Sequence, residues 1–462
     1  MSAVTKLGVS PDETYPELEV VRDLVERARR APFFAKKLAG RRLDSWDDFF
    51  ALPVTTKAEL RAAEPTDTLA VPLAEIWHYH ESFGTTGRPL SSWFTRADFD
   101  REVELDSRWT TPVQPGARVL NRLPYSFAVP PFVVEQKARA TGGVVIPASN
   151  LNWNVSYVRT LDLIHRLRAD VLVGLPLEPV ILALLASRQG YDLERDLGSV
   201  RHLMLGGGAV SPALKAWLER KWKASVGLVY GLTETGGSAS MCPAWRLHLH
   251  PGAFITEVVD PRTYERVAPG EVGVLLVSSY YRRGSPLVRY DTRDWCRVHT
   301  MPCPCGEAGR TFDVLGRLDD TIVLDGKTVY FADLEQAALE AAGELDSPLW
   351  FAIVTGRRLH LRLETHNGVR ELAPAARDRL ADTLKVPLRV EVCRKGELLN
   401  LTAMASTPEV GKPQALCDWR KDPRRSATLY EALIKWPEMK PLELLDMLWR
   451  VVKNAWLRLT LR

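Results

Sequence analysis

The stretch YVRTLDLIHRLRADVLVGLP, residues 157–176, joins a segment with apolar side chains at helical spacing to a short apolar run that ends in Gly-Leu-Pro. The same order recurs downstream, where ALKAWLERKW (213–222) precedes SVGLVYGL (225–232). Helical patterns that alternate with buried-strand patterns predict a parallel sheet with helical crossovers. Because ligands of such sheets collect at the carboxyl ends of the strands, we expect the functional site in the turns that follow them.

The pattern extends in both directions along the 462-residue chain, which is long enough for two or three structural units. Residues 18–39 predict one amphipathic helix, because apolar positions recur there at helical spacing. Further strand-like runs are ARVLNRLPY (117–125), GGVVIPA (142–148) and HLMLGGGA (202–209), and a β-rich stretch follows from about 253 to 330. We predict an α/β protein with a large multi-layer N-terminal domain (1–318) that includes a β-rich subdomain, a small mobile α+β C-terminal domain (319–418), and a basic amphipathic helical tail (419–462).

The composition is that of a globular protein, with 46% hydrophobic and 26% charged residues. A net charge of +4 gives no reason to expect a nucleic-acid partner. The polar N-terminus and the lack of a long apolar run predict a cytoplasmic protein without a signal peptide or a membrane span. Six cysteines in a chain of this length predict reduced thiols or metal ligands, not a disulfide framework.

An ordered set of motifs carries the functional prediction. In SFGTTGRP (82–89), backbone N–H groups, hydroxyls and one arginine can cradle a phosphate, although the loop taken alone is more often a plain turn. YGLTETGG (230–237), RYDTRD (289–294) and GRLDD (316–320) follow in order, and VGKPQAL (410–416) holds a late lysine. Together with LPVTTKAELR (52–61), this set resembles the adenylate-forming superfamily of acyl-CoA synthetases and adenylation domains, and within it the phenylacetate-CoA ligases.

The resemblance implies a reaction in two steps. Enzymes of this superfamily join a carboxylate to the α-phosphate of ATP, release pyrophosphate, and then pass the acyl group to a nucleophile. ATP, Mg²⁺ and, as the favoured acceptor, CoA are therefore expected, and Asp319 is the implied hinge about which the small domain rotates. The implied catalytic residues are Lys412, Glu234 and Arg317, with Glu234 also as the Mg²⁺ ligand. The implied ATP and AMP site comprises Thr85, Thr86, Gly87, Arg88, Gly207, Gly208, Ala209, Tyr230, Gly231, Thr233 and Asp294.

Two further groups of residues are candidates for binding. Tyr125 and Phe127 lie where relatives line the acyl pocket, and they favour an aromatic or apolar acid, although the same residues can belong to the core. Thiolates and a neutral imidazole suit tetrahedral zinc of a structural kind, and reduced thiols are the alternative. The candidate zinc ligands are Cys242, Cys303, Cys305 and either His248 or His250.

Departures from the family pattern leave the acceptor open. Phe83 and Leu90 leave Arg88 as the only cation of the first loop, and LDGKTVYFADLE (324–335) differs from phenylacetate-CoA ligases where the acceptor tunnel is expected. The favoured function is a ligase that forms an acyl adenylate from a small carboxylic acid and transfers the acyl group to CoA. The alternatives are an amide synthetase or carrier-protein ligase, which gives the adenylate to an amine or a carrier protein, and a non-catalytic nucleotide-binding protein. The tail can serve a homodimer, another partner or the protein's own body.

Overall fold

The computed structural model describes residues 15–82, 88–106, 113–150, 154–250, 252–307, 310–406 and 415–421. Thr85, Thr86, Gly87 and Lys412 therefore lie outside the described residues, as does the tail from residue 422 onward. No helix in the described ranges is long and apolar enough to cross a membrane.

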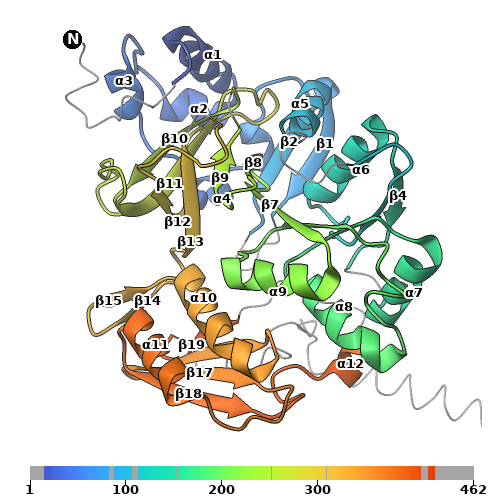
Figure 1. Ribbon diagram of the computed structural model, residues 1–462. Coiled ribbons are helices and arrows are strands. Elements are labelled where there is room, and N and C mark those ends of the chain that lie inside the picture. The colour runs from blue at the N-terminus through green and yellow to red at the C-terminus, as the bar shows by residue number, and fades with distance from the viewer. Residues whose placement is uncertain are drawn as a thin grey trace, which may run out of the picture.

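One eleven-stranded sheet runs through the centre of the protein (Figure 1). Its order is β10-β11-β12-β13-β9-β8-β7-β6-β5-β3-β4. Its strands are β3 (Arg118–Asn121), β4 (Val144–Pro147), β5 (Val171–Gly174), β6 (His202–Gly206), β7 (Ser225–Leu232), β8 (Gly236–Met241), β9 (Leu247–Leu249), β10 (Phe254–Val259), β11 (Val272–Ser279), β12 (Leu287–Val298) and β13 (Thr311–Arg317). Strands β3 to β7 pair in parallel, and the other neighbours pair antiparallel. The predicted α/β class is confirmed, and the predicted β-rich stretch continues the same sheet as far as Arg317, beyond which its last two strands form a separate hairpin.

Helices connect the parallel strands as the sequence pattern predicts. They are α6 (Pro130–Ala140), α7 (Tyr157–Leu167), α8 (Glu178–Ala186) and α9 (Pro212–Trp222). Ser156 and Ser211 cap α7 and α9, each accepting a hydrogen bond from a free backbone N–H of the first turn. All four residues of β5 are buried, which is why this strand reads as a continuous apolar run.

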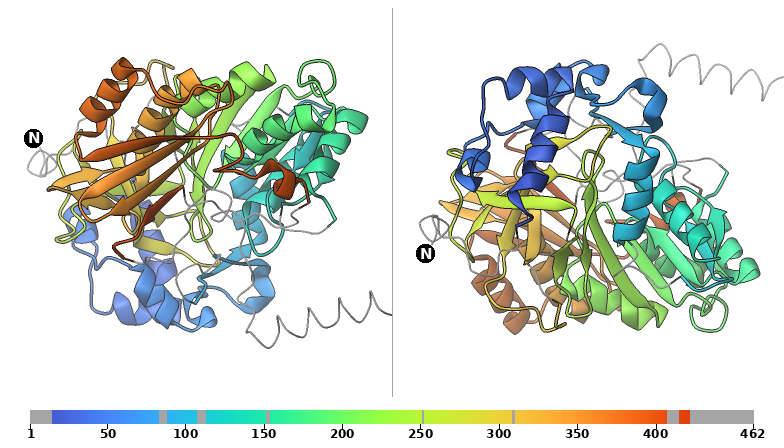
Figure 2. Two further views of the ribbon diagram at one scale, coloured as in Figure 1. Left: turned by 90° about the horizontal axis from the view of Figure 1, so that it is seen from below. Right: turned by 90° about the horizontal axis from the view of Figure 1, so that it is seen from above.

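The N-terminal part of the chain forms short helices and one hairpin. These are α1 (Leu18–Ala28), α2 (Pro32–Lys37), α3 (Trp46–Phe50), α4 (Lys57–Ala62), the 3₁₀ helices η2 (Pro65–Thr68) and η3 (Leu73–Glu75), the hairpin of β1 (Ile76–Glu81) with β2 (Ser91–Thr95), and α5 (Arg96–Asp106). The prediction of a single helix over 18–39 is wrong, because α2 restarts at Pro32, which lacks a backbone N–H and suits the first position of a helix. Viewed from above, these helices (blue) lie over strands coloured yellow and orange (Figure 2).

A smaller α+β unit follows β13. It comprises the hairpin of β14 (Ile322–Leu324) with β15 (Lys327–Val329), α10 (Phe331–Ala342), the 3₁₀ helix η5 (Gly343–Leu345), β16 (Trp350–Thr355), β17 (Arg358–Glu364), α11 (Pro374–Leu384), β18 (Leu388–Cys393), α12 (Leu401–Ser406) and β19 (Leu416–Asp418). Its four-stranded sheet has the order β18-β17-β16-β19. This unit, orange to red, lies below the large sheet in Figure 1, with α10 beside α9.

Polar side chains of α10 join the two units at the start of α9. Glu335 Oε2 accepts a hydrogen bond from Ser211 N at 2.7 Å, and Gln336 Oε1 accepts one from Ala213 N at 2.9 Å. These N–H groups have no partner within α9, so α10 supplies the cap from another part of the chain. Burial raises the pKa of Glu335 to about 7. The contact therefore holds the small unit against the helix that follows β6.

Candidate active site

The site centres on Asp294 of β12, which is only 3% exposed. Its Oδ2 accepts a hydrogen bond from the Tyr230 hydroxyl of β7 at 2.7 Å, and its Oδ1 lies 3.4 Å from Nε of Arg317, which is paired with it across β12 and β13. Burial raises the pKa of Asp294, and the charge of Arg317 opposes this shift. Residues from three of the predicted motifs therefore meet at one carboxylate.

A second carboxylate, Glu234, lies in the turn between β7 and β8 and is also buried. The hydroxyl of Tyr290 donates a hydrogen bond to Glu234 Oε1 at 3.1 Å, and Lys57 Nζ lies 3.9 Å from the same oxygen. Burial lowers the pKa of Lys57, and the carboxylate of Glu234 opposes this shift. Carboxylate oxygens are the ligands that Mg²⁺ prefers, so Glu234 fits the predicted role.

Lys57 is a site residue that the sequence prediction missed. Thr55 N donates to Arg289 O at 2.9 Å, and Thr55 Oγ1 donates to a backbone carbonyl of β12 at 2.7 Å. Arg289 is itself fixed by a buried bidentate ion pair with Glu257, with both N···O distances 2.8 Å. Thr56 then caps α4, so Lys57 is the first helical residue and lies beside Glu234. Lys57 lies in LPVTTKAELR (52–61), a segment that contributes to the family resemblance but from which no role for the lysine was predicted.

The predicted hinge is tied to β12 by Arg293. Its guanidinium lies 2.5 Å from Asp319 Oδ1, and its carbonyl accepts a hydrogen bond from Leu318 N at 2.8 Å. The hydrogen bonds from Arg293 lower the pKa of Asp319. Gly316, at φ +131°, lets the first residue of α10 approach, because a Cβ there would lie 2.9 Å from Cβ of Phe331. The segment that would act as a hinge is thus held by polar contacts on one side and close packing on the other.

One loop of the predicted ATP and AMP site borders a cavity between the two units. Gly207, Gly208 and Ala209 line it from the turn between β6 and α9, and Phe331 and Trp350 line it from the smaller unit. The cavity has a volume of about 110 Å³, and most of its lining residues are apolar. The small unit and the loop of Gly207, Gly208 and Ala209, predicted to bind ATP and AMP, therefore line the same cavity.

Three further residues of the predicted ATP and AMP site, Gly231, Thr233 and Arg88, do not line this cavity. Gly231 belongs to the close hairpin beside Glu234, where a Cβ at Gly231 would lie 2.3 Å from a backbone oxygen of Gly236. Thr233 lies in the same turn. Arg88 forms a surface ion pair with Glu64 at 3.2 Å, and no described contact joins Arg88 to Asp294 or Glu234. Its role at the phosphates stays a prediction.

Tyr125 and Phe127 lie in the loop that follows β3. The Tyr125 hydroxyl accepts a hydrogen bond from Asn121 Nδ2 at 3.1 Å, and burial raises its pKa to about 12. Phe127 is 59% exposed and has a φ of +56°. Both residues are therefore at the carboxyl end of a parallel strand, where ligands of such sheets bind.

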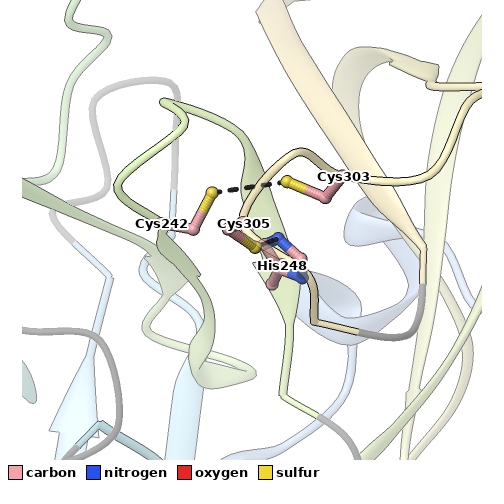
Figure 3. Close-up of side chains that lie close together, drawn as sticks. All are labelled: Cys242, His248, Cys303 and Cys305. Carbon is pink, nitrogen blue, oxygen red and sulfur yellow. Dashed lines mark hydrogen bonds between the residues drawn. The ribbon is translucent and has the colours of Figure 1, made fainter.

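The four candidate zinc ligands converge (Figure 3). Cys242 follows β8, His248 is on β9, and Cys303 and Cys305 lie between β12 and β13. All four ligand atoms lie within 4.8 Å of one another, with Cys242 Sγ 3.6 Å from Cys303 Sγ and Cys305 Sγ 3.3 Å from His248 Nε2. His250 lies outside the cluster, with its Nε2 3.4 Å from Ser240 Oγ.

Comparison with known proteins supports the predicted family resemblance. Residues 84–281 match the family described as AMP-binding enzyme. The chain is 29% identical to phenylacetate-coenzyme A ligase of Thermus thermophilus over 322 residues, which cover 67% of this chain and 71% of that enzyme. It is 28% identical to the Escherichia coli phenylacetate-coenzyme A ligase over 306 residues, which cover 63% and 66% of the two chains.

Solved structures confirm the fold. A 2-hydroxyisobutyryl-CoA ligase in its postadenylation state superposes with a TM-score of 0.75 at 22% identity, over 89% of this chain and 92% of that chain. The predicted resemblance is therefore confirmed at two levels. Residues 84–281 match the AMP-binding family, and the chain shares the fold of the solved acyl-CoA ligase. Among the adenylate-forming enzymes, it resembles the phenylacetate-CoA ligases.

The Tyr230–Asp294 hydrogen bond gives the site its first test. Tyr230→Phe removes the hydroxyl that orients Asp294, a residue of the predicted ATP site, so we expect affinity for ATP to fall roughly tenfold, because hydrogen bonds to charged groups contribute about 1.5–3 kcal/mol. Titration calorimetry with ATP measures the change. The matched control is Tyr264→Phe, since the hydroxyl of Tyr264 donates to Asp291 Oδ2 on the same strand at 3.1 Å. Equal affinity in the Tyr230 and Tyr264 variants would contradict the assignment of Asp294.

Proposed function

We propose that the protein is an ATP-dependent ligase that converts a carboxylic acid to an acyl adenylate with release of pyrophosphate, and then transfers the acyl group to CoA. The observation that carries this proposal is that Tyr230 and Arg317 contact the carboxylate of Asp294, while the buried Glu234 accepts a hydrogen bond from Tyr290 on the same strand as Asp294. These residues come from three separate motifs and supply the polar groups that a ribose, a phosphate and Mg²⁺ require.

In the first half-reaction, the protein positions ATP and neutralises charge. Asp294 accepts hydrogen bonds from the ribose hydroxyls, and Arg317 lies beside it to contact ribose or phosphate. Glu234 would hold Mg²⁺, which supplies charge stabilisation at the phosphates. Lys57 adds a cation on the same side, and Lys412 is assigned to the α-phosphate and the substrate carboxylate. Positioning and electrostatic stabilisation account for most of phosphoryl-group catalysis, and this site supplies both.

In the second half-reaction, the small domain rotates about Asp319. We assign residues 1–318 to the large domain and 319–418 to the small one, because β13, the last strand of the central sheet, ends at Arg317. Rotation would break the Arg293–Asp319 ion pair and the cap that Glu335 and Gln336 place on α9. One site is thereby closed by different surfaces in the two steps.

The acid is assigned to the aromatic or apolar class, since Tyr125 and Phe127 lie in the loop at the carboxyl end of the parallel strand β3, where ligands of such sheets bind. CoA is the favoured acceptor, because the curated relatives are named as coenzyme A ligases. An amine or a carrier protein is the alternative, supported by the altered acceptor segment at 324–335 and by the basic tail, 419–462, which is a candidate partner-binding segment.

Pyrophosphate release tests the proposal. Purified protein is incubated with ATP, Mg²⁺ and a panel of aryl and alkyl carboxylates, with CoA, an amine or a carrier protein, or no acceptor. We expect acid-dependent release of pyrophosphate, with aromatic or apolar acids preferred, and an acyl-CoA product. Release that leaves the acyl-AMP intact with CoA, but consumes it with an amine or carrier protein, would overturn CoA as the acceptor. No release with any acid would overturn the ligase function.

The cluster of Cys242, His248, Cys303 and Cys305 is proposed as a structural zinc site. A tetrahedral ion with Zn–S distances of about 2.3 Å holds its sulfurs about 3.8 Å apart, which fits the 3.6 Å between Cys242 and Cys303. Four protein ligands leave no open position, so the site would join β8, β9 and the β12–β13 connection without taking part in the reaction.

Metal removal tests the zinc site. We expect about one zinc per chain by elemental analysis, and a melting temperature lowered by roughly 5 °C or more on chelation, because metal binding contributes to folding free energy. Cys242→Ala should lose the zinc. The control, Cys393→Ala, removes a buried thiol outside the cluster and should keep it. Stoichiometric zinc in the Cys242 variant, or zinc-free native protein, would contradict the site.

A further inference from the structure

The loop between β3 and α6 contains an unusual turn at Phe127. Ala128 N donates a hydrogen bond to Ser126 O at 2.7 Å, and Phe127 between them has a φ of +56°. A hydrogen bond across three residues with a left-handed centre is a γ-turn of the rare, strained kind. For a bulky residue, this backbone costs on the order of 1 kcal/mol or more, so surrounding contacts must hold it.

Strand β1 supplies those contacts. The carbonyl of Phe127 accepts a hydrogen bond from Glu81 N at 3.2 Å and lies 3.1 Å from His80 Nδ1. Because a carbonyl only accepts, His80 carries its proton on Nδ1. Burial lowers the pKa of His80 to about 4, so the ring is neutral at physiological pH. Within the described residues, Nε2 of His80 has no hydrogen-bond partner, so the described hydrogen bonding of this ring is directed to Phe127.

Hydrogen bonds from Asn121 and ring contacts of Phe132 hold the rest of the loop. Asn121 is fully buried, and its Nδ2 donates to the Tyr125 hydroxyl at 3.1 Å and to Pro131 O at 3.0 Å, at the two ends of the loop. Phe132 packs 5.4 Å from the ring of Tyr125 and 5.5 Å from that of His80. The side chain of Phe127 is left exposed by this arrangement while its backbone is held rigid.

We propose that His80 is a positioning residue of the acid site, which holds the strained turn at Phe127 and thereby sets how tightly an aromatic or apolar acid binds. This inference rests on the proposed function, because it takes the loop that carries Tyr125 and Phe127 as a wall of that site. The same strand ends at Glu81, directly before the predicted phosphate loop at 82–89 in the sequence. Holding a binding residue in place before the substrate arrives lowers the entropy lost on binding.

Three variants separate the hydrogen bond from the packing. His80→Leu removes the donor and keeps an apolar side chain, and it should raise KM for the preferred acid about tenfold while KM for ATP changes by less than about twofold. His80→Asn keeps an N–H donor at the same position along the side chain, and it should restore KM for the acid to within about threefold of the native value. The control is His78→Leu. His78 stacks on His80 with ring centroids 5.3 Å apart, and no hydrogen bond is described for it, so KM for the acid should stay within about twofold.

A double-mutant cycle tests the route through Phe127. Glycine adopts a positive φ without strain, so in a Phe127→Gly background His80→Leu should have little further effect on KM for the acid. Thermal melting verifies that each variant is folded. If His80→Leu leaves KM for the acid unchanged, or if the two substitutions act independently, the positioning role is wrong. If the native protein releases no pyrophosphate with any acid, the proposed function fails first, and the inference fails with it.

Discussion

The buried ion pair between Arg289 and Glu257 is the interaction on which the site depends. It joins β12 to Glu257 of β10 at Arg289, where the chain takes a left-handed conformation, and Arg289 also donates a hydrogen bond to the carbonyl of Leu52. Removing one member of such a pair leaves an uncompensated buried charge, at a cost of about 3–5 kcal/mol. Asp294 lies further along the same strand, and Lys57 reaches Glu234 only because residue 55 is hydrogen-bonded to Arg289. An interaction remote from the chemistry thus sets the geometry of several functional groups.

The parallel half of the sheet could be predicted from the sequence because its strands are short, apolar and separated by amphipathic helices. Strand β12 could not, since its buried positions include Arg289, Asp291 and Asp294, whose side chains are held by the distant residues Glu257, Tyr264 and Tyr230, respectively. A periodicity argument assigns such a segment to a turn. Lys57 was missed for the same reason: nothing local in LPVTTKAELR shows that it faces Glu234.

The choice between His248 and His250 as the fourth candidate zinc ligand depends on the register of the sheet. His248 and His250 are both close to Cys242 in the sequence, and only the pairing of β9 with β8 and β13 shows that His248 faces the thiols. The break at Pro32, in contrast, was visible in the sequence, because proline removes a hydrogen-bond donor and belongs at a helix start. The cap that α10 places on α9 is a contact between units far apart in the chain, which no local pattern encodes.

The proposed function requires a carboxylate oxygen of the acid to attack the α-phosphate of ATP. The most direct test uses an acid whose carboxylate carries a heavy isotope of oxygen, with ATP, Mg²⁺ and CoA, and mass spectrometry of the products. Formation and transfer of an acyl adenylate must leave one labelled oxygen on AMP, and we predict that label there and none in pyrophosphate. Label in inorganic phosphate, with ADP as the nucleotide product, would show attack at the γ-phosphate and would rule out an acyl adenylate as the intermediate.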